Sequence, residues 1–258
     1  MKRREFLAAS IAASASAFAG NAQPQPASER EFYQIRRYQL QSGPQLALTS
    51  AYFSNALIPA LARLGMGPVG AMQLTYGPET PAYYLIIPGS SATALAELDL
   101  TLSRDTDFLK AAAPFWNATA AAPAFQRVES WLLAAFEGWP KLTPPAAGKR
   151  IFQLRTYESP SNGDHVRKVE MFHSGEFECF KQSGCNPVFF GDTLIGSRMP
   201  CLTYMLTFPD MAALEAGWDK FRTNPDWRKL SSNPRFAFDQ IVDNISNLIL
   251  TPLPCSQI

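Results

Sequence analysis

The polar residues with the clearest potential for chemistry occur as two copies of one pattern. The segment FYQIRRY carries Gln34, Arg36 and Tyr38, and the segment IFQLRTY, 119 residues later, carries Gln153, Arg155 and Tyr157. Alternate residues of a strand share one face of the sheet, so each triplet is expected on one side. We expect this to be the side that is enclosed when the two copies associate.

An enclosed arginine has two possible roles at these positions. It can hold an anion or a carbonyl group of a ligand, which makes all six residues candidate ligand-binding residues. It can also clamp the protein together through an internal carboxylate or carbonyl, because an unpaired buried charge is costly. The occurrence of the triplet in both copies favours the structural clamp, and the binding interpretation stays open.

Histidine is scarce, and only one of the two histidines has a neighbour suited to catalysis. His173 falls within a predicted helix, and Glu176 follows three residues later, which makes the two side chains neighbours on the helix surface. This arrangement suits a general base or a haem ligand. It suits a half-buried structural histidine equally well, and the first copy has Ser54 at the matching position. His165 is expected in the first turn of the same helix, in contact with solvent.

Several common site motifs are missing or stand in the wrong context. The segment GMGPVG at 65–70 has the letters of a dinucleotide loop, but it follows a predicted helix and precedes a strand, so we interpret it as a helix stop. The sequence has no C-x-x-C, H-E-x-x-H or G-x-S-x-G segment, and we predict no metal site and no nucleophile elbow. Cys185 and Cys201 flank a predicted strand pair, and a disulfide between them is possible in an exported protein.

Bulk composition excludes further classes. The formal charge of the 258 residues is +1, so nucleic acid and anionic lipid are not expected as partners. Hydrophobic residues make up 47% of the chain, which predicts a substantial core.

The N-terminus reads as a targeting segment. Arg3 and Arg4 precede Phe-Leu and a weakly apolar Ala/Ser-rich run, which resembles a twin-arginine export signal over residues 1–22. Residues 23–30 read as a flexible leader. We therefore expect a periplasmic or secreted protein, with no stable membrane span once the signal is cleaved.

The rest of the chain predicts two similar units. The first, residues 31–136, has strands at 32–38, 69–76, 82–87 and 126–136, helices at 44–64 and 92–102, and a short helical piece at 108–116. A Pro-rich linker follows at 137–149. The second unit, residues 150–258, has strands at 150–157, 188–192 and 201–208, and helices at 164–182 and 210–222. A further short helix starts at 224, and the segment 238–250 ends in a strand. Each order is β-α-β-β-α-β, a ferredoxin-like repeat, and the constant offset of 119 residues indicates a tandem duplication.

The second unit also carries motifs of a known family. YMLTFPDMAALE at 204–215, Trp218 and Asn-Pro-Asp-Trp at 224–227 closely resemble the NIPSNAP domain, as do the opening Y-x-I/L-R-x-Y strand and the GMGPVG turn. The resemblance spans roughly residues 31–254 and is looser in the first unit. It implies an α+β fold in which two ferredoxin-like units form a dimeric α+β barrel, here within one chain.

The function implied by the resemblance is open, since relatives on this fold include small monooxygenases, haem-degrading enzymes and dye-decolourising peroxidases. Our first hypothesis is an exported protein that binds a small apolar or aromatic ligand or a protein partner without a cofactor. A second copy of the chain is among the candidate partners, which would make a homo-oligomer. The alternative is a monooxygenase-like or haem-dependent oxidoreductase that uses His173 and the two arginines. Closed carboxylate pairs on both arginines would count against the enzyme.

Overall fold

A computed structural model describes residues 30–258, and the predicted signal peptide and most of the predicted leader lie outside this range. The strands of the first half are β1 (Phe32–Gln39), β2 (Gly70–Leu74), β3 (Ala82–Gly89) and β4 (Arg127–Ala135). Those of the second half are β5 (Ile151–Glu158), β6 (Asn186–Ile195), β7 (Cys201–Phe208) and β8 (Asn244–Pro252).

The helices of the first half are α2 (Pro44–Tyr52), α3 (Ile58–Arg63), α4 (Ala92–Ala96), α5 (Leu98–Leu102) and α6 (Thr106–Trp116). The second half has α7 (Asn162–Met171), α8 (Phe177–Gln182), α9 (Met211–Thr223), α10 (Pro225–Ser231) and α11 (Phe238–Ile241). Within residues 30–258, no helix has the length and apolar character needed to cross a membrane.

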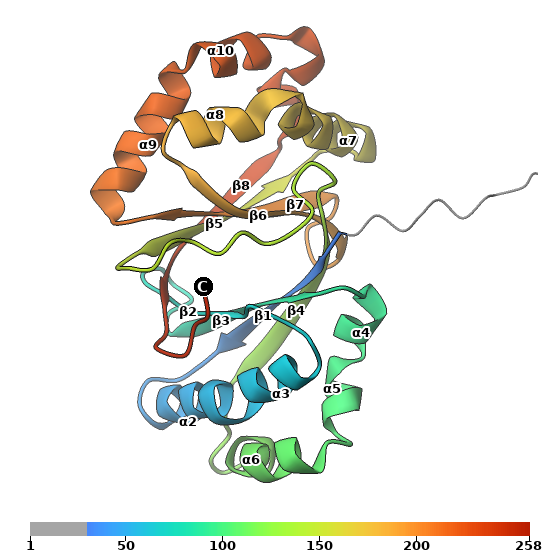
Figure 1. Cartoon of the computed structure of the whole chain (residues 1–258), viewed down its shortest axis with the longest axis vertical. Helices are drawn as coiled ribbons and strands as arrows, with labels where there is room; N and C mark the ends of the chain where they lie inside the picture. Colours follow the sequence, from blue (N-terminus) through green and yellow to red (C-terminus); the bar gives the residue numbers. More distant parts are fainter. Residues whose placement is uncertain (1–29) are drawn as a thin grey trace, which may run out of the picture.

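The eight strands form one closed barrel in the order β1-β3-β2-β8-β5-β7-β6-β4. The strand order within the first half is β4-β1-β3-β2, and that within the second is β8-β5-β7-β6, with antiparallel pairs β2–β8 and β4–β6 joining the halves. The helices of each half cover the outer face of their own strands, so the strands lie in the middle between two helical layers (Figure 1). The predicted α+β fold and antiparallel barrel are confirmed.

Three apolar cores follow from this arrangement. One lies between the helices and strands of the first half, a second between those of the second half, and a third fills the barrel.

Tyr33 and Ile35 point into the barrel, and because side chains alternate along a strand, Gln34 and Arg36 point outward to the helices. The two polar triplets therefore lie on opposite outer faces. The expectation that association encloses all six on one side is wrong, since that side is the apolar barrel interior.

The first long helix of each half contains a π-helical segment that the apolar periodicity did not predict. These segments span Phe53–Leu57 and Phe172–Glu176, at the same offset of 119 residues. A π segment inserts one extra residue into the helical repeat. Two residues eight apart then lie on one face, as two residues seven apart do in an uninterrupted α-helix. This change of phase brings Lys168 and Glu176 together in the second half, where their ion pair measures 2.7 Å.

The segment 238–250 ends in a strand, as predicted, since β8 starts at Asn244 after the short helix α11. The disulfide that the sequence left open between Cys185 and Cys201 is not formed, and both residues are free thiols. They lie at opposite ends of one hairpin, because Asn186 pairs with Thr207 and Asp192 pairs with Leu202. Burial also raises the pKa of the Cys185 thiol to about 12.

The C-terminal tail crosses from the second half to the first. Leu253 and Gln257 donate backbone hydrogen bonds to Ala71 (2.8 Å) and Val69 (2.9 Å). Ile258 is 1% exposed and belongs to the core inside the barrel. The tail therefore ties β2 to the second half beyond the end of β8.

Candidate functional site

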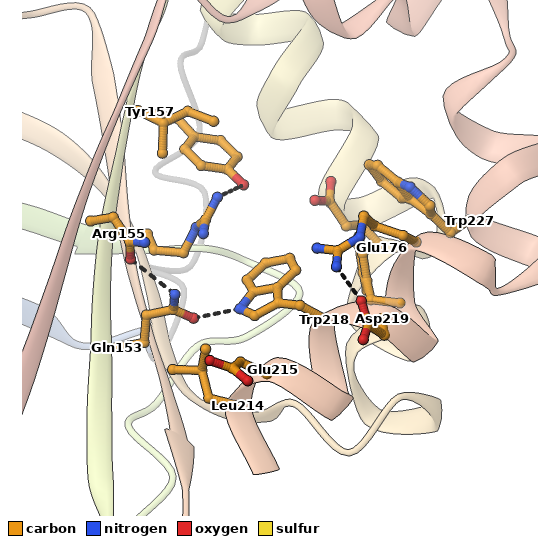
Figure 2. Close-up of a pocket in the computed structure, with 13 residues that line it drawn as sticks. Gln153, Arg155, Tyr157, Glu176, Leu214, Glu215, Trp218, Asp219 and Trp227 are labelled. Atoms are coloured by element: carbon orange, nitrogen blue, oxygen red, sulfur yellow. Dashed lines mark hydrogen bonds and ion pairs between the residues drawn. The ribbon is translucent and has the colours of Figure 1, made fainter. Parts of the chain in front are cut away.

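A cavity of about 690 Å³ lies on the outer face of the second-half sheet, beneath α9 and α10 (Figure 2). Strands β5 and β8 form one wall, and the helices form the other. Its lining residues are Gln153, Arg155, Tyr157, Glu176, Leu214, Glu215, Trp218, Asp219, Phe221, Arg222, Trp227, Ile245 and Asn247. The cavity thus combines aromatic walls with several convergent polar groups, as small-molecule sites do.

Local sequence explains how the helical wall is built. Asp210 caps α9 by accepting the Ala213 backbone N–H at 2.8 Å. Asn224 caps α10 through the N–H groups of Asp226 and Trp227, and Pro225 occupies the first turn, where its missing N–H costs nothing. The Asn-Pro-Asp-Trp motif is therefore a helix start that aims Trp227 at Phe221, with ring centroids 4.5 Å apart.

Arg155 is the central cation of the cavity. Its guanidinium lies 4.4 Å from the ring centroid of Trp218, within the range of cation–π attraction, and donates to the Tyr157 hydroxyl at 3.1 Å. Its buried Nε has no hydrogen-bond partner. In Figure 2 the head of Arg155 lies between Tyr157 and Trp218.

A chain of hydrogen bonds fixes the aromatic wall next to Arg155. The Trp218 indole N–H donates to Gln153 Oε1 at 2.7 Å, and the Gln153 amide donates to Asn247 Oδ1 at 2.9 Å. Gln153 is 2% exposed, so both of its bonds replace lost contacts with water. The indole plane is therefore held in place by β5 and β8.

Behind the cavity lies a buried ion pair. Lys168 and Glu176 are joined at 2.7 Å, with side chains 0% and 2% exposed. Burial raises the pKa of Glu176 and lowers that of Lys168, and in both cases the partner's charge opposes the shift. Lys168 Nζ also lies 4.4 Å from the Phe172 ring centroid. Glu176 is thus a cavity-wall carboxylate whose charge is matched from within the protein.

Two tyrosines add hydroxyl groups next to Arg155 on the strand side of the cavity. Tyr204 donates to the Tyr157 hydroxyl at 2.8 Å. Burial raises the pKa of both phenols, so both are protonated at neutral pH.

The matching triplet of the first half makes a different set of contacts. Arg36 donates from Nε to Gln34 at 2.9 Å and from Nη1 to Asp99 at 2.9 Å. The Arg36 side chain is 6% exposed, and Asp99 on α5 is 62% exposed. A carboxylate of the protein therefore closes this arginine, as expected of a structural clamp.

His173 is not part of the cavity. Its Nε2 accepts the Gly138 backbone N–H at 3.1 Å, and its Nδ1 lies 2.9 Å from the Val169 carbonyl oxygen. Both ring nitrogens are therefore engaged by backbone, and the ring joins the linker to α7. The expectation that His173 acts with Glu176 is wrong, because Glu176 points inward to Lys168. His165, expected in solvent, is 9% exposed and contacts Asp192 at 2.7 Å.

Haem does not fit this site through the residue expected to ligate it. His173 lies elsewhere with both nitrogens occupied, and the residues that line the cavity include no histidine, cysteine or methionine. Across residues 30–258, no group of three His, Cys, Asp or Glu side chains is placed to hold a metal ion.

The structure brings together four of the eight predicted site residues. Gln153, Arg155, Tyr157 and Glu176 line the cavity, whereas Gln34, Arg36 and Tyr38 lie on the opposite face and His173 lies outside. Sequence reasoning missed Trp218, Trp227 and Lys168 as parts of the site. The two tryptophans belong to the motifs that carried the family resemblance, whereas Lys168 gave no signal because helix periodicity does not anticipate the π segment.

A comparison with known protein families finds a match in the second half of the chain. Residues 152–257 match the NIPSNAP family. This NIPSNAP region, as residues 152–257 are called below, contains every residue that lines the cavity. No curated protein matches the sequence.

Solved structures extend the likeness of fold to both halves of the chain. A protein from Lactobacillus acidophilus, described provisionally as a monooxygenase, aligns over 87% of this chain and 94% of its own, at 12% identity and a TM-score of 0.59. One from Fusobacterium nucleatum, described in the same way, aligns over 87% and 93%, at 8% identity and a TM-score of 0.58. At such low identity the likeness establishes the fold alone.

Proposed function

We propose that the NIPSNAP region binds a small aromatic molecule in the cavity between β5, β8 and helices α9 and α10. The observation that carries the proposal is the aromatic lining of the cavity, in which Trp218 lies against the Arg155 guanidinium and Trp227 adds a second indole further along the helical wall. Stacking on indole rings and burial of apolar area supply affinity for a planar ligand, and the polar groups supply orientation. A cavity of about 690 Å³ with this mixed aromatic and polar lining favours a small molecule over a protein partner.

Binding at this place is tested by filling the cavity. Ile245 lines its mouth on β8 and is 36% exposed, so Ile245→Trp fills the cavity with little strain. Val128 is the matched control, because it pairs with Tyr38 as Ile245 pairs with Tyr157. Isothermal titration calorimetry with 2-naphthoate and 2-naphthamide is expected to show one-site binding in the wild type and in Val128→Trp, and none in Ile245→Trp. Absence of saturable binding of both probes, or equal binding by Ile245→Trp, would overturn the proposal.

A second candidate function is oxidation of the bound molecule without a cofactor. The observation that favours it is Glu176, a buried carboxylate at the cavity wall whose pKa is raised by burial, as in groups that accept a proton from a substrate. Native mass spectrometry of protein purified from its own periplasm would reveal a retained ligand. Incubation of that complex under air is expected to replace two hydrogen atoms of the ligand by one oxygen atom, with the ligand as the electron donor and the second oxygen atom of O2 released as water. An unchanged ligand mass would leave binding alone.

Two finer points belong to the same proposal. The first half is interpreted as a diverged NIPSNAP repeat, supported by the shared strand order and the π segments at one offset. The mature protein is proposed to act in the periplasm, supported by Arg3 and Arg4 in the N-terminal segment. Fractionation of cells that express an Arg3→Lys/Arg4→Lys variant is expected to show precursor retained in the cytoplasm, and normal export would contradict this.

A further inference from the structure

The offset of 119 residues places Asp99 of α5 and Trp218 of α9 at matching positions. Their neighbours agree with the alignment, since Leu95 and Leu214 are both buried, as are Leu102 and Phe221. The arginines beneath them, Arg36 and Arg155, are matched by the same offset. A carboxylate above one arginine is therefore replaced by an indole above the other.

This replacement leaves the two guanidinium groups in different states of charge compensation. Arg36 has the Asp99 carboxylate at 2.9 Å. The ion pairs within residues 30–258 include none to Arg155, whose polar contacts are the neutral hydroxyls of Tyr157 and Tyr204 and whose Nε has no partner. A largely enclosed cation without an anion is unfavourable, so the site is suited to receive one.

No carboxylate around the cavity, within the described residues, forms an ion pair with Arg155. The charge of Arg155 favours ionised Glu176, but the direct partner of Glu176 is Lys168, and Asp219 on the rim is paired with Arg222. Glu215 is exposed on the outer turn of α9 and forms no ion pair with Arg155. Figure 2 shows the Asp219 carboxylate beyond Trp218 and directed away from Arg155.

We infer that the ligand of this cavity is an aromatic carboxylate, whose anionic group is held by Arg155 and takes the role that Asp99 plays for Arg36. The inference rests on the proposed function and names the class of molecule bound. Arg155 supplies charge-assisted hydrogen bonds to the carboxylate, and Trp218 stacks on the aromatic part. The first half is a copy of the same site that the protein closes with its own carboxylate.

The test compares 2-naphthoate with 2-naphthamide, which differ only in the charge of the polar group. Charge-assisted hydrogen bonds predict that wild-type protein binds the carboxylate about 10- to 100-fold more tightly. Arg155→Met is expected to abolish this preference. Arg36→Met is the matched control and is expected to keep the preference, because Arg36 does not line the cavity. This variant should remain folded, since the Asp99 carboxylate that loses its partner is exposed to water.

A second pair of variants separates charge from the loss of the aromatic wall. Trp218→Asp recreates the first-half arrangement and is expected to remove the preference for 2-naphthoate, whereas the neutral Trp218→Asn keeps it at lower overall affinity. Equal affinity of wild type for the two probes would overturn the carboxylate inference and leave the aromatic-binding proposal standing. The same preference in Arg155→Met would also overturn it. Failure of both probes to bind would overturn inference and proposal together.

Discussion

The two halves of the chain share a backbone plan and differ in what lies over one arginine. In the first half, Arg36 and Asp99 form an internal pair beneath short helices. In the second half, Arg155 lies against Trp218 in a cavity of about 690 Å³. Equivalent strand positions thus hold a closed ion pair in one half and line a cavity in the other. Because the triplet is repeated, the sequence favoured a structural role for both arginines. The contacts agree with that role for Arg36 only.

A second difference lies behind the cavity. The buried pair of Lys168 and Glu176 corresponds, by the offset of 119 residues, to Thr49 and Leu57, which are both buried in the first half. The first half thus fills these two positions with a hydroxyl and an aliphatic side chain. Burying two charges is costly even when they are paired, so this pair is not explained by stability alone. Glu176 of this pair lines the cavity, so the pair forms part of the candidate site.

The largest effect is expected from breaking this ion pair. Lys168→Thr leaves Glu176 buried without its partner and should lower the free energy of unfolding by about 3–5 kcal/mol. The double variant Lys168→Thr/Glu176→Leu, which installs the first-half residues, should lie within about 1 kcal/mol of the wild type. Urea denaturation with an unchanged m-value measures both. A cost below about 1 kcal/mol for the single variant would show that Glu176 is already neutral and that no ion pair exists.

A smaller effect is expected from opening the first-half clamp. Asp99→Ala leaves Arg36, with a side chain 6% exposed, without its carboxylate, and should cost about 1–2 kcal/mol, between the values for exposed and buried pairs. Acetate should restore part of the lost stability when compared with chloride at equal ionic strength, and it should not do so in Asp99→Ala/Arg36→Met. The exposed pair Asp219–Arg222 supplies the control, since Asp219→Ala should cost less than about 0.5 kcal/mol. An Asp99→Ala protein as stable as the wild type would contradict the description of Arg36 as a clamp.

The sequence predicted the elements of the fold better than the faces they present. Strong period-two patterns identified β1, β5 and β7 almost to the residue, and Gly65 and Gly184 ended the first helix of each half. The predicted side of the sheet for the triplets was wrong. Alternation divides the residues of a strand between two sides but does not indicate which side contacts the helices. The barrel interior belongs to the apolar set, Tyr33 and Ile35 with Phe152 and Leu154.

Only part of the candidate site was predicted, because local patterns do not contain long-range packing. Gln153, Arg155 and Tyr157 follow from one strand, so local periodicity groups them correctly. Glu176 reached the cavity through a π segment, and it was therefore assigned the wrong partner, His173 in place of Lys168. The opposing wall comes from α9 and α10, more than fifty residues later, and its contact with β5 depends on tertiary packing that no local pattern contains.

The smallest effect is expected from His173, and it tests which residues belong to the site. His173→Ala removes the bond to the Gly138 backbone N–H and the contact with the Val169 carbonyl, both near solvent, and should cost about 1 kcal/mol of stability. Ser54→Ala is the matched control, because Ser54 is exposed, and should change the stability by less than about 0.5 kcal/mol. Neither variant should alter the affinity for 2-naphthoate, since neither residue lines the cavity. If His173→Ala abolished binding while the protein remained folded, the site would have to include the α7–linker junction. The division between a closed first half and an open second half would then no longer account for the ligand.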